Sequence, residues 1–188
     1  SVAVYRFNLL MQMQKQEEAY KSLEEYNGRY SSPYVLSTLA DHQLNMYNDS
    51  TALAYYAEAL DIAPDYAPAL LGKAETLRMT RKYDGYFEVL EQFVSDPLTP
   101  VQGKNDYLTA IIQRTDPKFM KSFTPQMDSV VEKAVQAHPS DSTMMSLAGI
   151  WYYSTDRKPE AAKWFRLNAD TYPESVGARA SLVEFLMY

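Results

Sequence analysis

The stretch ALAYYAEALDIAP, from Ala52 to Pro64, decides the fold that the sequence predicts. A small residue, Ala52, lies one helical turn before a large ring, Tyr56, and a proline ends the run. A small residue next to a ring lets two helices approach closely while the ring fills the remaining space. The stretch is therefore predicted to be one helix that packs against a partner helix.

The same pattern recurs along the chain. In the helix predicted before Pro173, Ala161 and Phe165 keep the distances from the proline that Ala52 and Tyr56 keep from Pro64. Successive prolines that are expected to close helices are separated by 31, 33, 42 and 34 residues: Pro33, Pro64, Pro97, Pro139 and Pro173. A near-constant spacing of this kind indicates a repeat.

A second periodic segment precedes each of these helices. Apolar residues keep helical spacing in YVLSTLADHQL (34–44), ALLGKAETL (69–77) and MMSLAGIWYY (144–153). Polar breaks separate the two segments of each pair. A hydroxyl residue directly before a proline predicts a helix N-terminus at Ser32, Thr99 and Thr124. Each repeat is therefore predicted to be two antiparallel helices.

This arrangement resembles the tetratricopeptide repeat, which has two helices per roughly 34 residues. The resemblance implies an all-α fold, a right-handed superhelical stack of antiparallel helix pairs, forming a single array over residues 1–188. The expected repeats are 1–32 (degenerate), 33–66, 67–97, 98–139 with an insertion at 114–125, 140–173, and an incomplete first helix at 174–188.

Two segments depart from the regular pattern. The insertion, RTDPKFMKSFTP, carries Phe119, Met120 and Phe123, which either form a lip that contacts a partner or only cover the core. The last segment, GARASLVEFLMY, is expected to expose an apolar stripe at Leu182, Phe185 and Leu186. Either the native chain continues beyond Tyr188, or another chain covers this stripe by self-association.

Composition and residue types exclude several classes of function. The chain has no cysteine and only two histidines, His42 and His138, which lie in different repeats, so we expect no catalytic site, metal site or cofactor. The formal net charge of −6, without a Lys and Arg cluster, argues against a nucleic acid partner. No apolar run is long enough to span a membrane. We expect a soluble bacterial protein, of the periplasm, the envelope or the cytoplasm.

The resemblance further implies a concave groove lined by the first helix of each pair. The residues expected to face it are Tyr34, Ser37, Asp41, Leu44, Leu71, Glu75, Arg78, Met79, Ser146, Ile150 and Tyr153. Their mixture of apolar, aromatic and polar groups suits a protein or peptide partner. The sequence therefore predicts a non-catalytic binding scaffold. The alternatives are a glycan or nutrient-binding module of an envelope protein and a regulatory segment of a longer enzyme or sensor.

Overall fold

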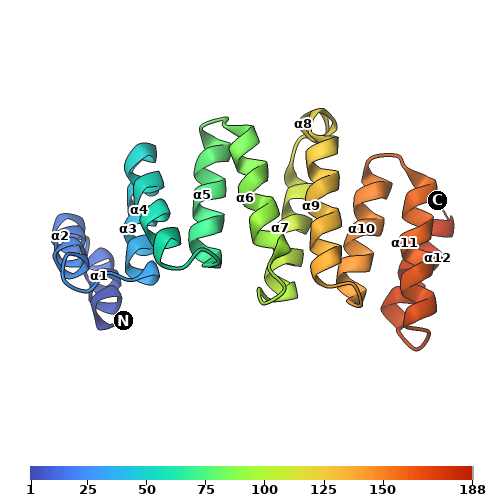
Figure 1. Cartoon of the computed structure of the whole chain (residues 1–188), viewed down its shortest axis with the longest axis horizontal. Coiled ribbons are helices and arrows are strands. Elements are labelled where there is room, and N and C mark those ends of the chain that lie inside the picture. The colour runs from blue at the N-terminus through green and yellow to red at the C-terminus, as the bar shows by residue number, and fades with distance from the viewer. Residues whose placement is uncertain (188) are drawn as a thin grey trace. The chain divides into compact units, whose positions relative to one another are not determined.

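The computed structural model describes residues 1–187, and helices are the only regular secondary structure over this part of the chain (Figure 1). The helices are α1 (Val2–Gln12), α2 (Gln16–Asn27), α3 (Pro33–Asn45), α4 (Asp49–Ile62), α5 (Ala67–Met79), α6 (Tyr83–Ser95), α7 (Val101–Arg114), α8 (Pro117–Ser122), α9 (Thr124–Ala137), α10 (Ser142–Ser154), α11 (Lys158–Thr171) and α12 (Val176–Met187). They form two compact units, one from Ser1 to Phe93 and one from Val94 onward. Each unit is described by itself.

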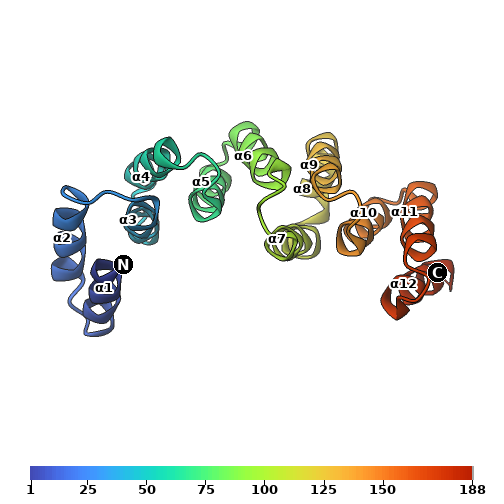
Figure 2. The same ribbon diagram turned by 60° about the horizontal axis from the view of Figure 1, so that its bottom comes forward.

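The first unit is built from helical hairpins. α1 packs on α2 and α3 packs on α4, while α5 contacts both α3 and α4. Figure 2 shows α3 and α5 on one side of this unit and α4 on the other. Ala52 and Tyr56 are both completely buried here, in a cluster with Ala40, Ala59 and Ala69. Ala52 and Tyr56, the small residue and the ring of the Ala52–Pro64 stretch, therefore lie in a helix interface, as the sequence predicts.

The turn inside each hairpin has the same backbone geometry in four places. One residue in each turn has a left-handed conformation, with φ of 60° at Gln14, 60° at Tyr47, 58° at Arg81 and 61° at Asp156. The N–H of the following residue donates to the carbonyl five residues earlier; Asn48, for example, donates to Gln43 over 2.9 Å. This is the Schellman end of a helix, which usually has glycine at the left-handed position.

Tyr47→Gly is expected to stabilise the protein by about 0.5–1 kcal/mol, because glycine adopts a positive φ without a steric penalty. Tyr47 is exposed, so the substitution removes little packing. The control is Ala54→Gly, at an exposed position inside α4, which should cost about 1 kcal/mol. Urea unfolding followed by circular dichroism measures both. Destabilisation by both variants would contradict the assigned turn geometry.

The turn between successive hairpins is also repeated, and its geometry explains the positions of four of the five prolines. Pro64, Pro97, Pro139 and Pro173 each occupy the second position of a four-residue turn, closed by an N–H···O bond of 2.9 to 3.3 Å. A fixed φ suits proline for that position. Pro33 differs, because it is the first residue of α3. The expectation that Pro33 closes a helix is therefore wrong.

Only one of the three predicted hydroxyl caps is formed. The side chain of Ser32 accepts a bond from the N–H of Val35. Thr99 instead donates its hydroxyl to the carboxylate of Asp96 over 2.6 Å, and α7 begins after Pro100. Thr124 is already inside α9, and its hydroxyl donates to the carbonyl of Met120. Neither threonine occupies the N-cap position, because Pro100 precedes α7 and Thr124 is itself the first residue of α9.

A polar cluster ties three helices of the second unit together. Asp128, on α9, accepts a bond of 2.7 Å from the indole Nε1 of Trp151, on α10. The same carboxylate accepts two bonds, of 2.8 and 2.7 Å, from the guanidinium of Arg157, which precedes α11. These bonds raise the pKa of Arg157, and the guanidinium also lies over the ring of Tyr152. Asp128 thereby joins α9 to the α10–α11 hairpin.

Candidate functional site

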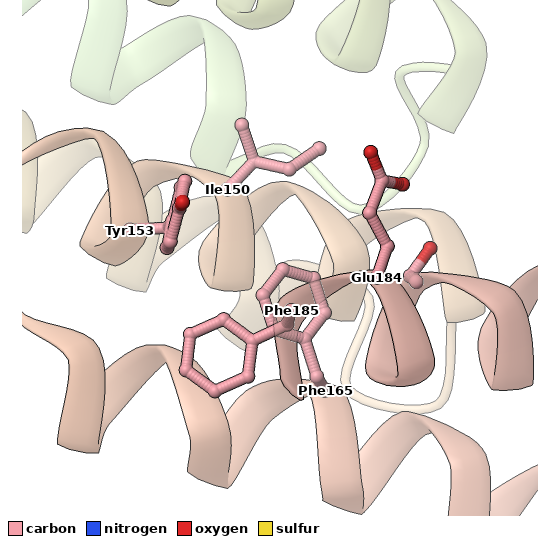
Figure 3. A pocket seen from close by; sticks show the side chains of 6 residues that line it. Ile150, Tyr153, Phe165, Glu184 and Phe185 are labelled. Carbon is pink, nitrogen blue, oxygen red and sulfur yellow. The ribbon is translucent and has the colours of Figure 1, made fainter. Parts of the chain in front are cut away.

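The hollow of most interest lies in the second unit, where α10, α11 and α12 meet (Figure 3). Its volume is about 280 Å³, and it is lined by Ile150, Tyr153, Phe165, Ser181, Glu184 and Phe185. Four of these six side chains are apolar or aromatic. We call it the α12 hollow.

Close packing of α10 on α11 builds the floor of the α12 hollow. A Cβ atom placed on Gly149 would lie 2.6 Å from the ring of Phe165, so the glycine allows this ring to sit directly on α10. The ring of Phe185 lies 5.4 Å from that of Phe165 and 5.7 Å from that of Tyr153. The three rings come from three different helices, and their contacts hold α12 in place.

The rim of the α12 hollow is polar and acidic. The hydroxyl of Ser181 donates to the carbonyl of Gly177 over 3.0 Å, which leaves its oxygen able to accept another bond. Glu184 is the only charged residue in the lining and is exposed. A volume of this size is at the lower end for small-molecule sites. The site can therefore hold one apolar side chain, with a basic or hydrogen-bond-donating group beside it.

Two of the three groove residues expected in the second unit lie together in this hollow. Ile150 and Tyr153 are exposed and line it. Ser146 does not, since its hydroxyl accepts a bond of 2.9 Å from Asn168 in the α10–α11 interface. This bond was not foreseen because the two residues are 22 positions apart.

The C-terminal stripe differs from its expected form. Phe185 packs against the rings of Tyr153 and Phe165, and Leu182 is partly covered within the unit. Only Leu186 of the three expected residues stays exposed. The α10–α11 hairpin itself covers Phe185, which was expected to be covered by a continuation of the chain or by another chain.

In the first unit, the expected groove residues Tyr34 and Met79 are exposed, while Leu44 and Leu71 are half-buried. Ser37 is only 3 % exposed, so its place in a groove is wrong. The reason is that α3 contacts α2, α4 and α5, which widens its buried face beyond one stripe.

The charged residues of this face already have partners. Asp41 accepts a bond from the hydroxyl of Tyr56 over 2.5 Å; desolvation raises the pKa of Asp41, and this bond opposes the shift. Arg78 donates from Nε to Glu75 over 2.9 Å and forms an ion pair with it. Pairing with Glu75 leaves Arg78 less able to bind an anionic group of a partner.

The insertion forms a short helix, α8, whose first turn is capped by the carboxylate of Asp116. Phe119 and Phe123 are half-buried, with their rings 4.7 Å apart. Met120 is 5 % exposed, so it is a core residue and not part of a lip. It is one of the residues that line a second hollow, of about 590 Å³, at the ends of α7, α8 and α10.

Lys104 is a buried lysine that was not predicted from the sequence. Lys104 is fully buried on α7, where Nζ donates to the carbonyl of Asp96 over 2.5 Å and shares a hydrogen bond of 2.8 Å with Nε2 of His138. Burial lowers the pKa of Lys104, and the charge of Asp96 opposes the shift. The sequence did contain an indication of this burial. Lys104 lies one helical turn before Leu108, a core residue, and is therefore on the same face of α7. The two hydrogen bonds of Lys104 join α7 to the segment before it and to the end of α9.

Both histidines contact other side chains within their own unit. His42 stacks on Tyr20, with ring centres 5.2 Å apart, and meets the edge of Phe7; burial lowers its pKa. His138 is the partner of Lys104. Within residues 1–187, no three His, Asp or Glu side chains are grouped so that they could hold a metal ion. Within the same residues, the helices are too short or too polar to cross a bilayer.

Solved structures show what the chain is similar to. No protein-family model matches it, and no curated protein matches its sequence. A tetratricopeptide repeat protein from Parabacteroides merdae is 11% identical with a TM-score of 0.53, covering 98% of this chain and 71% of that one. A structure of MamA is 13% identical with a TM-score of 0.51, covering 89% and 95%. A likeness at this identity concerns the fold, and it confirms the prediction from sequence: the chain has the helical repeat fold of tetratricopeptide repeat proteins.

Proposed function

We propose that the protein is a non-catalytic scaffold that binds a segment of a partner protein, and that the α12 hollow receives the segment's anchoring side chain. The observation that carries the proposal is the hollow itself, in which Ile150, Tyr153 and Phe185 present an open apolar surface on a rigid three-helix frame. Anchors of peptide ligands bind in such pockets, with polar contacts at the rim.

The chemistry of the rim defines the proposed partner. Glu184 and the formal net charge of −6 favour a basic residue next to the anchor. The volume of about 280 Å³ suits a single leucine, isoleucine, methionine or phenylalanine side chain. The proposed ligand is therefore a peptide with one large apolar residue adjacent to Lys or Arg.

The test is selection of random peptides on the 188-residue chain, followed by fluorescence polarisation with the selected peptides. Tyr153→Ala and Ile150→Asp are each expected to weaken binding about tenfold or more, because they remove the wall of the hollow or place a charge in it. Tyr34→Ala is the matched control, an exposed tyrosine of the other unit, and should change binding less than about twofold.

Two results would contradict this assignment. One is equal loss of binding in Tyr34→Ala and Tyr153→Ala, which would show that the binding surface is not confined to the α12 hollow. The other is failure to select any peptide while simple sugars raise the melting temperature of the protein, which would favour the glycan-binding alternative.

A further inference from the structure

The outer face of α12 carries an apolar stripe that no other helix of its unit covers. Val176, Val183 and Met187 are 74 %, 55 % and 73 % exposed, and Ala180 is exposed with them. Their spacing of four, three and four residues places them on one line of the helix. The opposite face, with Ala178 and Phe185, packs on α10 and α11.

This spacing is that of the a and d positions of a coiled coil, with Val176 and Val183 at d and Ala180 and Met187 at a. The small side chain of Ala180 allows a second helix to approach closely. In this frame Arg179 occupies a g position. Glu184 occupies the e position that follows it.

The charges beside the stripe indicate what covers it. In a pair of parallel helices, a g residue of one helix meets the e residue five positions later on the other. Two parallel copies of α12 would therefore place Arg179 of each against Glu184 of its partner. In an antiparallel pair equal positions meet, so Glu184 would approach a second Glu184. Within residues 1–187, Arg179 and Glu184 are both exposed and neither has an ion-pair partner.

We propose that the protein forms a two-fold symmetric dimer through parallel pairing of α12 with α12 of a second copy. Val176, Ala180, Val183 and Met187 form the seam, and two Arg179–Glu184 pairs flank it. Because α10 and α11 already hold α12 in helical form, pairing costs little ordering entropy. The seam is only about 17 Å long, so we expect a weak, concentration-dependent dimer. The seam is on the opposite face from Phe185, and Glu184 alone belongs both to the flank of the seam and to the lining of the α12 hollow. Arg179→Glu lies outside that lining, so it tests the dimer separately from peptide binding in the α12 hollow.

Charge reversal tests the pairing by sedimentation velocity over a roughly 100-fold range of protein concentration. Arg179→Glu and Glu184→Arg, each alone, should weaken dimerisation about tenfold, because both pairs become repulsive. An equimolar mixture of the two variants should dimerise again, because every facing pair then has opposite charges. Restoration on mixing also shows that both variants are folded. A wild-type chain that stays monomeric throughout the range, or a mixture that stays monomeric, would overturn the proposal.

Disulfide trapping tests the orientation, and the chain suits it because it has no cysteine of its own. Val176→Cys alone and Met187→Cys alone should each cross-link to a copy of itself on mild oxidation, since equal positions meet in a parallel pair. Lys163→Cys, at an exposed position of α11, is the control for random collision. Cross-linking only in a mixture of Val176→Cys with Met187→Cys would show antiparallel pairing and overturn the proposal. Cross-linking yields of Val176→Cys and Met187→Cys that are no higher than that of Lys163→Cys would also overturn the proposal.

Discussion

Gly72→Ala is expected to lower the free energy of unfolding by about 2 kcal/mol, although alanine is the better helix former. A Cβ atom at position 72 would lie 2.3 Å from the ring of Tyr56. That ring is completely buried between α4 and α5 and donates its hydroxyl to Asp41, so it cannot move aside without breaking other contacts. The cost of this overlap exceeds the propensity gain of about 1 kcal/mol.

A double-mutant cycle and a matched control make this expectation specific. Tyr56→Leu should cost less in the Gly72→Ala background than in the wild type, by about 1 kcal/mol or more, because the smaller side chain relieves the overlap. Gly103→Ala is the control, since a Cβ there meets no atom within 4 Å, and it should stabilise the protein. Urea unfolding measures all four variants. If Gly72→Ala stabilised the protein as Gly103→Ala does, the close approach of α4 and α5 would be refuted.

Asp128→Ala should destabilise the second unit by about 2–3 kcal/mol. The substitution leaves the indole N–H of Trp151, a buried residue, without an acceptor and leaves Arg157 without its ion-pair partner. Asp128→Asn should have a smaller effect, because an amide oxygen can still accept from Trp151. The two variants therefore separate the hydrogen bond from the charge.

Glu132→Ala supplies the control for this cluster, since Glu132 is an exposed carboxylate one turn further along α9. It should change the free energy of unfolding by no more than about 0.5 kcal/mol. Thermal and urea unfolding at neutral pH compare the three variants. Similar values for Asp128→Ala and Glu132→Ala would show that Asp128 does not join the helices of this unit.

The candidate site could be predicted only in part. Ile150 and Tyr153 were placed on the groove side of a first helix, and both line the α12 hollow. Phe185 was expected to be exposed and covered by a continuation of the chain or by another chain, yet it lines the same hollow and packs on Tyr153 and Phe165. The periodicity of α12 shows that Phe185 is on an apolar face. It does not show that rings from two other helices meet that face.

The sequence by itself determined the repeat, because the alternation of small residues, rings and prolines is a local property of each segment. Ala52 with Tyr56, and Ala161 with Phe165, had to be buried wherever a partner helix packed, and all four are buried. The tertiary structure alone decided how many neighbours each helix has. It buried Ser37 and Met120, placed Lys104 beside His138, and joined Asp128 to Arg157 across 29 residues. Burial and hydrogen bonding depend on which helices meet, and helices distant in sequence meet only when the hairpins have packed together.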